Sequence, residues 1–217
     1  MKMLLFLLIA LAAGSGSCAS FPCDKAVSQT EKLICRDPEL SRLDEDMATS
    51  FKKQLAAIDG AYKKDALNEQ KNWLRFVRSL CDDASCLRRA YETRNQLIAA
   101  CSPNCVDPVE VYRLGDENYN LVTLRDPARR LKSFSAKVQA RALGSVLGCE
   151  TLIEVPVGTA HGNNSFGGVC KVKTANKTHY MAICDDDMVG HFGAIEAESG
   201  LPQKALVDFT IKECFGG

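Results

Sequence analysis

The sequence predicts an α+β protein in which a small disulfide-linked four-helix domain precedes an α+β domain with an antiparallel sheet. Apolar residues recur every three or four positions up to about residue 99, which is the spacing of amphipathic helices. Later apolar runs alternate with polar residues between turn signals, as antiparallel strands do. Cysteines are spread through both parts, which favours cross-linking in each. We expect the helical domain at residues 21–105 and the second domain at residues 106–217.

Residues 1–20 have the pattern of a secretory signal peptide. A lysine is followed by the apolar run Met3–Ala13, too short to cross a bilayer, and then by small residues. Cleavage after Ala19 or Ser20 satisfies the small-residue rule. Simple cleavage is favoured over a lipid anchor at Cys18, because the position three residues earlier is not the leucine of a lipoprotein signal. We therefore expect an exported protein, periplasmic or secreted, without a transmembrane span.

Ten cysteines remain once Cys18 has been removed or acylated. An even number at scattered spacings in an exported chain favours disulfides, up to five, over zinc or redox chemistry. The ten are Cys23, Cys35, Cys81, Cys86, Cys101, Cys105, Cys149, Cys170, Cys184 and Cys214.

The composition is that of an ordinary globular protein. Lysine and arginine total 27 and are balanced by 27 aspartate and glutamate residues, so bulk attraction to nucleic acid is not indicated. The charges are unevenly placed, because residues 125–141 are basic while Asp185–Asp187, Glu196 and Glu198 form an acidic stretch. The second part therefore has regions of opposite sign.

Four helices are expected in the first part. Residues 38–58 carry the longest apolar stripe, with a proline in the first turn and a glycine just past the end. Residues 63–80 and 85–99 form two more amphipathic helices, and a shorter one lies near residues 25–34. Four such helices bury little surface, and a disulfide compensates by about 2–4 kcal/mol.

The helices constrain the pairing of the first four cysteines. A short connection makes the helices at 38–58 and 63–80 antiparallel, so the start of the first should lie beside the end of the second. A bond between Cys35 and Cys81 is therefore preferred, which leaves Cys23 to bond with Cys86. A bond between Cys23 and Cys35 is disfavoured, because about ten helical residues would separate them by about 15 Å.

The remaining six cysteines are assigned more locally. Cys101 and Cys105 enclose a proline and an asparagine, which favour a tight turn and a local bond. Four cysteines in the second domain allow three connectivities, of which we choose Cys149–Cys170 with Cys184–Cys214.

The second domain is expected to mix strands and helices. A basic helix begins at Pro127, and its apolar face continues towards Leu147. The expected strands are 109–114, 119–124, 151–157, 168–173 and 179–184, and the closing helix is 202–213.

Two segments supply candidate binding residues. Residues 158–168 combine four glycines with polar side chains and one aromatic, and such a loop can bring its backbone close to a ligand. A long hairpin turn is the structural alternative. The candidates are His161, Asn163, Asn164 and Phe166 in this loop, with Asp185, Asp186 and Asp187 in the later acidic turn.

The sequence offers no complete catalytic constellation. No two of His161, His179 and His191 have the spacing of a helical metal pair. Ser165 lacks the full pattern of a nucleophile elbow, because Asn163 replaces the first glycine and only Gly167 follows, and the aspartate run lacks the spaced donors of a calcium loop. We expect a binding protein that is not an enzyme and that uses no cofactor or metal.

A pattern of cysteines, acids, aromatics and arginines runs through the helical part. In order it is Cys23, Ala26, Glu31, Ile34, Cys35, Asp37, Leu40, Leu43, Asp44, Gln70, Trp73, Arg78, Cys81, Cys86, Leu87, Tyr91, Arg94 and Leu97. This order and spacing resembles the N-terminal domain of the LprI-type lysozyme inhibitor family. The resemblance covers about the first half of the mature chain, and the second half resembles no family that we recognise.

The resemblance implies a role and a set of scaffold residues. It implies an inhibitor that occludes the cleft of a lysozyme or a related peptidoglycan-cleaving enzyme, without identifying an inhibitory residue. Trp73 and Tyr91 are expected in the core, and Arg78 and Arg94 should bind carbonyls or nearby acids such as Asp44.

Many lysozymes are basic and work through two carboxylates in a groove. The acidic stretch would face the basic rim of such an enzyme, while His161, Asn163 or Asn164 would face its carboxylates. Two other hypotheses remain open. In the first, the chain is an envelope structural or stress protein whose basic helix binds an acidic partner. In the second, it is an immunity protein against a cell-wall-targeting toxin.

Overall fold

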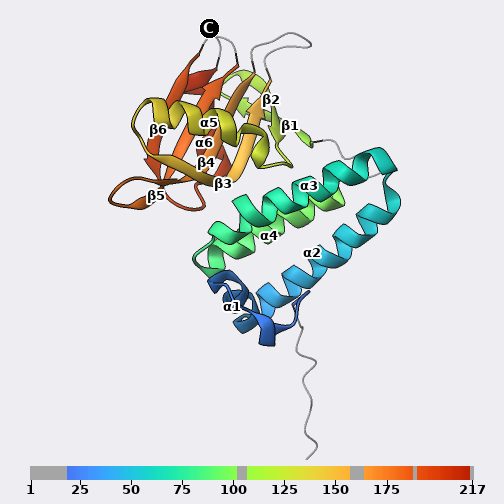
Figure 1. Cartoon of the computed structure of the whole chain (residues 1–217). Helices are drawn as coiled ribbons and strands as arrows, with labels where there is room; N and C mark the ends of the chain where they lie inside the picture. The colour runs from blue at the N-terminus through green and yellow to red at the C-terminus, as the bar shows by residue number, and fades with distance from the viewer. Residues whose placement is uncertain (1–18, 102–106, 157–163, 188–189, 216–217) are drawn as a thin grey trace, which may run out of the picture.

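The computed structural model describes residues 19–101, 107–156, 164–187 and 190–215. A group of helices forms one end of the molecule, and a sheet flanked by two helices forms the other (Figure 1). The predicted α+β class, with helices first and an antiparallel sheet after them, is confirmed. Among the described helices, none has the length and apolar character needed to cross a bilayer.

Three of the four α-helices described at the helical end begin at a residue whose side chain caps the helix. Ser28 and Glu31 form a reciprocal capping box, Asp37 caps the next helix with Pro38 in its first turn, and Asp83 caps the last. The elements are the 3-10 turn η1 (Cys23–Lys25), α1 (Gln29–Arg36), α2 (Pro38–Ala57), α3 (Gly60–Phe76), the 3-10 turn η2 (Arg78–Leu80) and α4 (Ala84–Ala99).

One apolar core holds the helical end together. Helix α2 packs on α1 and along α4. The rings of Trp73 and Tyr91 meet edge to face at 5.3 Å, and both residues are buried, as the family pattern implied. Ala19 also belongs to this core and is 6% exposed, so a residue next to the expected leader cleavage site packs with the helices.

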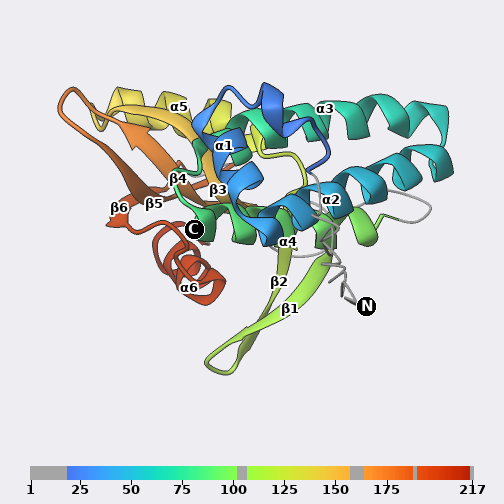
Figure 2. The ribbon, with the colours of Figure 1, turned by 90° about the horizontal axis from the view of Figure 1, so that it is seen from below.

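The sheet is a six-stranded antiparallel meander in which neighbours along the chain are neighbours in space. Its strands are β1 (Val109–Leu114), β2 (Glu117–Thr123), β3 (Ser145–Val155), β4 (Ser165–Lys173), β5 (Thr178–Asp186) and β6 (Phe192–Ala197). The β1–β2 hairpin extends past the rest of the sheet (Figure 2), because β2 pairs with β3 only through Val122 and Thr123.

Two helices cover opposite faces of the sheet (Figure 2). Helix α5 (Ala128–Ala140) packs on one face through Phe134, and α6 (Gln203–Cys214) packs on the other through Leu206. Adjacent glycines in β4 make room for both. A Cβ at Gly168 would lie 2.8 Å from the Phe134 ring, and one at Gly167 would lie 2.1 Å from Thr210 Oγ1.

The structure corrects the disulfides predicted for the helical end. Cys23 bonds to Cys35, and Cys81 bonds to Cys86, so the predicted Cys35–Cys81 and Cys23–Cys86 pairs are wrong. The argument against Cys23–Cys35 assumed a helix between them. Only α1 is regular there, and the 3-10 turn with the extended Ala26 returns Cys23 to within 5.7 Å of Cys35, Cα to Cα.

The disulfides predicted for the sheet end are confirmed. Cys149 on β3 bonds to Cys170 on β4, and Cys184 on β5 bonds to Cys214 at the end of α6. Cys105 lies outside the described residues, so the Cys101–Cys105 bond stays a prediction.

Most boundaries in the sheet end lie within three residues of the sequence-based expectation, and two differ by more. Helix α5 ends at Ala140 instead of continuing towards Leu147, because Ala142 and Gly144 adopt positive φ angles of 56° and 123°. That turn starts β3 six residues earlier than expected. Strand β6 was not predicted, because Phe192–Ala197 has a Gly-Ala pair and no clear alternation.

Candidate functional site

The predicted binding residues fall into described and undescribed groups. His161 and Asn163 lie outside the described residues. Asn164 donates a hydrogen bond from Nδ2 to Glu154 Oε1 at 2.7 Å. Its main-chain carbonyl accepts a hydrogen bond from the main-chain N–H of Asp187 at 3.1 Å. Asn164 therefore links the end of β3 to the end of β5.

Arg130 of α5 organises three of the predicted residues. Its guanidinium carbon lies 3.4 Å above the centre of the Phe166 ring, a cation–π contact. The same group pairs with Asp187, and its Nε lies 3.5 Å from Asp185 Oδ1. The basic helix thus neutralises the acidic turn of its own chain.

Asp185 is fully buried and held by α5. Its Oδ2 accepts a hydrogen bond from Ser133 Oγ at 2.5 Å and pairs with Lys137 Nζ at 3.1 Å. A buried carboxylate needs such partners, since removing it from water without them costs several kcal/mol.

Asp186 is also buried and organises the turn that follows β5. It accepts the main-chain N–H groups of Gly190 at 2.7 Å and His191 at 3.0 Å, and His191 Nδ1 lies 2.9 Å from its carboxylate. The side chains of Asp185 and Asp186 therefore point into the protein, and neither is exposed for contact with another protein. Of the acidic run, Asp187 alone is exposed, and the binding role of the set stays a prediction.

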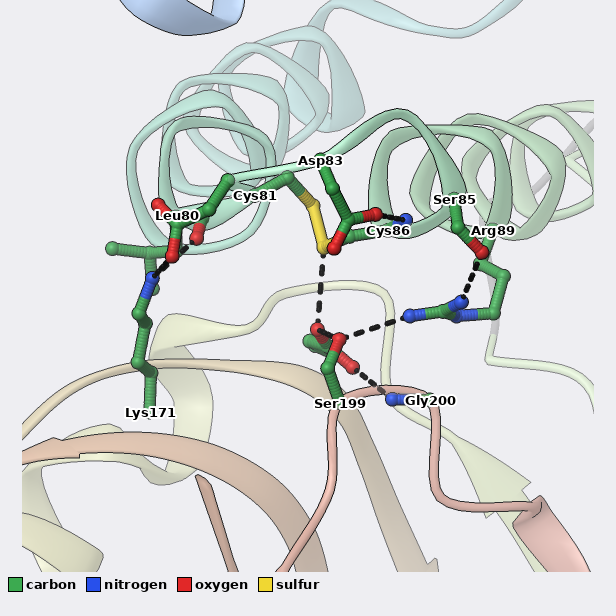
Figure 3. The surroundings of a disulfide bond; sticks show 11 residues. Leu80, Cys81, Asp83, Ser85, Cys86, Arg89, Lys171, Ser199 and Gly200 are labelled. Carbon is green, nitrogen blue, oxygen red and sulfur yellow. Dashed lines mark hydrogen bonds and ion pairs between the residues drawn. A yellow bond between two sulfur atoms is a disulfide. The ribbon is translucent and has the colours of Figure 1, made fainter. Parts of the chain in front are cut away.

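The helical end meets the sheet end around the Cys81–Cys86 disulfide (Figure 3). Lys171 on β4 donates from Nζ to the carbonyl of Leu80 at 2.8 Å and to Asp82 Oδ2 at 2.5 Å. This disulfide loop is therefore tied to the sheet.

Arg89 of α4 and Glu150 of β3 complete this contact through Ser199, and Figure 3 shows Arg89 directed towards Ser199. Arg89 donates to Ser85 Oγ at 2.8 Å and to Ser199 Oγ at 2.9 Å. Glu150 accepts from Ser199 Oγ at 2.6 Å and from the main-chain N–H of Gly200 at 2.8 Å. Gly200 has φ of +75°, a backbone conformation that favours glycine, and a Cβ there would lie 2.6 Å from Arg89 Cζ and displace the guanidinium.

Glu150 also lies against the disulfide itself. Its Oε1 is 3.2 Å from Cys86 Sγ. Because Sγ is bonded to Cys81, it carries no hydrogen to donate, and the contact is one of packing. Burial raises the pKa of Tyr180 well above its usual range, and the nearby Glu150 carboxylate raises it further.

A second set of contacts joins the two ends further along α4. Arg94 is 1% exposed and donates to Gln70 Oε1 at 3.0 Å and to the carbonyl of Arg125 at 3.3 Å. Arg125 in turn donates to the carbonyl of Leu97. Arg94 thus binds a carbonyl, as the sequence predicted.

Between these two sets of contacts, a slot of about 410 Å³ separates α4 from the sheet. One stripe of α4 forms its first wall. The start of β1, the end of β2, the middle of β3 and the turn before α6 form the opposite wall. Its polar and charged lining residues include Arg89, Thr93, Gln96, Glu110, Glu150 and Thr151. This volume is within the range of small-ligand sites, which commonly lie where two structural units meet.

Sequence reasoning did not find the slot. Arg89, Glu110 and Glu150 come from α4, β1 and β3, and no spacing in the sequence connects them. Within the described ranges, no group of three or more histidine, cysteine, aspartate or glutamate side chains is arranged to hold a metal ion.

Comparison with curated proteins found similarity over part of the chain. It is 30% identical over 99 residues to Lipoprotein LprI of Mycobacterium bovis, and equally to Lipoprotein LprI of Mycobacterium tuberculosis. The matched region is 43% of this chain and 48% of each relative, so the chain spans about half the length of the curated relatives it matches. No family model and no solved structure matches the chain.

The similarity confirms that part of this chain resembles LprI. Together with the disulfides, which form and persist in oxidising compartments, it indicates an exported or envelope protein.

Proposed function

We propose that this chain is an exported, non-catalytic protein that binds a lysozyme or a related peptidoglycan-cleaving enzyme and occludes its cleft. The observation that carries the proposal is the similarity to Lipoprotein LprI over 99 residues. The cysteine, acid and aromatic pattern of residues 23–97 points to the same inhibitor family.

The arrangement of the chain is compatible with occlusion. Four described disulfides fix both ends of the molecule, and a pre-ordered surface loses little entropy when it enters a cleft. At the start of β4, Asn164 is held by Glu154 of β3 and Phe166 is held by Arg130 of α5. The segment 157–163 therefore joins two firmly anchored strands, which suits a binding loop.

The structure also limits how this loop should be tested. Phe166 is 4% exposed and packs in the sheet core, so its replacement would disturb the fold. Residues 161–163 can instead be exchanged for Gly-Ser-Gly while Asn164 and Phe166 stay in place. The matched control exchanges Ala175 and Asn176 of the β4–β5 turn, both exposed, for Gly-Ser.

The experiment measures lysis of peptidoglycan by a panel of lysozymes with the oxidatively refolded chain from Ala19 onward. Inhibition that survives the control exchange and is lost with the 161–163 exchange supports the loop as the contact. Inhibition unchanged by both exchanges would reject the loop, and absence of inhibition across the panel would reject the function.

A further inference from the structure

The slot between α4 and the sheet has fixed walls. The Arg89–Ser199–Glu150 contacts close one end, and the Arg94 and Arg125 contacts hold α4 further along. The slot is therefore part of the folded arrangement and does not depend on a single loop.

The lining of the slot combines apolar walls with an excess of negative charge. Ala90 and Leu97 on α4 face Leu201 and Pro202 across it. Among the described residues that line it, the charged ones are two glutamates, Glu110 and Glu150, and one arginine, Arg89. The slot itself thus has a formal charge of −1.

The one cation is already engaged, whereas one of the carboxylates is not. Arg89 donates to Ser85 and Ser199. Glu110 on β1 is exposed at the slot, and its side-chain carboxylate has no hydrogen bond or ion pair to any residue that the structure describes. A ligand entering the slot therefore meets an unpaired carboxylate next to apolar walls.

We propose that this slot binds a lysine or arginine side chain presented by a peptide segment of a protein partner. The aliphatic stem of such a side chain packs against apolar surface while its charged head reaches a carboxylate. Here the stem lies between Leu97 and Leu201, and the head forms a charge-assisted hydrogen bond with Glu110. The site does not depend on the proposed inhibition of a lysozyme.

The test uses two peptides that share an unbranched aliphatic stem, of which only one carries a charged guanidinium head. Acetyl-Gly-Arg-Gly-amide and acetyl-Gly-norleucine-Gly-amide are titrated into the isotopically labelled, oxidised chain, and amide shifts are followed by NMR. We expect the arginine peptide to shift slot residues of α4 and β1, and to bind more weakly as salt rises. Equal binding of both peptides, or shifts confined to other surfaces, would overturn the proposal.

Three variants locate the contact. Glu110→Gln should weaken binding of the arginine peptide by about three- to fivefold, as expected for a partly exposed ion pair. Gln96→Trp, which adds bulk at an exposed position of the slot wall, should abolish binding. Glu92→Gln, on α4 but outside the slot lining, is the matched control and should leave binding unchanged.

The variants also separate this site from the proposed function. Peptide binding is measured without any enzyme. The chain can therefore bind the peptide without inhibiting a lysozyme, or inhibit a lysozyme without binding the peptide. Each variant is first compared with the parent by thermal unfolding. Unchanged peptide binding in folded Gln96→Trp and Glu110→Gln variants would contradict the assignment.

Discussion

Ser20 holds the buried carboxylate of Asp44. The main-chain N–H of Ser20 donates to Asp44 Oδ2 at 2.8 Å, and Ser20 Oγ donates to the same oxygen at 2.5 Å. Tyr91 Oη donates to Oδ1 at 2.6 Å, and Arg78 Nη1 lies 3.6 Å from it. A residue from the expected leader thus completes a polar cluster in the helical core, where Asp44 is fully buried.

The first prediction concerns the charge of Asp44. Asp44→Asn keeps the size of the side chain but removes the charge that three donors and Arg78 satisfy. We expect the free energy of unfolding to fall by about 2 kcal/mol, measured by urea denaturation. Asp46→Asn removes an exposed carboxylate whose partner in the described part of the chain is Arg42, and it should change the free energy by less than about 0.5 kcal/mol. Equal effects would contradict the buried cluster.

The second prediction concerns the start of the mature chain. A refolded chain that begins at Phe21 lacks both Ser20 donors and the buried Ala19. It should unfold at a lower urea concentration than a chain that begins at Ala19, because the Asp44 carboxylate keeps fewer partners. Identical midpoints would show that residues 19 and 20 contribute nothing to the fold.

The third prediction is a pH dependence. Burial raises the pKa of the Tyr91 hydroxyl above its usual value of about 10. The folded state therefore keeps this proton when the unfolded state loses it, and the stability that the group contributes is full below pH 10 and lost as the pH rises further. Above pH 10, the free energy of unfolding should fall more steeply in the parent than in Tyr91→Phe, by up to about 1.4 kcal/mol per pH unit.

The control for this measurement is Tyr62→Phe, since Tyr62 is 41% exposed. Its unfolding free energy should follow the parent at every pH. Parallel curves for the parent and Tyr91→Phe between pH 9 and 11 would contradict the assignment.

The fourth prediction concerns Arg130. Arg130→Met removes the cation above Phe166 and the pairs with Asp185 and Asp187. Asp185 keeps Lys137 and Ser133, so we expect a loss of about 2 kcal/mol in unfolding free energy and not a failure to fold. Arg113→Met, at an exposed ion pair of the β1–β2 hairpin, should cost less than about 0.5 kcal/mol. A loss in Arg130→Met as small as that in the control would show that α5 does not stabilise the acidic turn.

The local patterns of the sequence predicted most elements, because each is encoded by neighbouring residues. The apolar stripe and Pro38 located α2 closely. The connectivity of Cys23, Cys35, Cys81 and Cys86 depended on how a 3-10 turn and an extended residue fold back, and periodicity carries no such information.

The candidate site was predicted only in part. Asn164, Phe166 and Asp187 do lie together. The sequence showed separate acidic and basic stretches but not that Arg130 and Lys137 would pair with Asp185. Such contacts arise only when α5 packs on the sheet, so the free charges expected for a partner are largely used within the chain.

Lysis of peptidoglycan by a panel of lysozymes, with the oxidised chain from Ala19 to Gly217 added at increasing concentration, tests the central claim most directly. The account predicts saturable inhibition of at least one enzyme, with a matching 1:1 complex detected by sedimentation and loss of both after reduction of the disulfides. Full lytic activity of every enzyme at a large molar excess of the folded chain would contradict it.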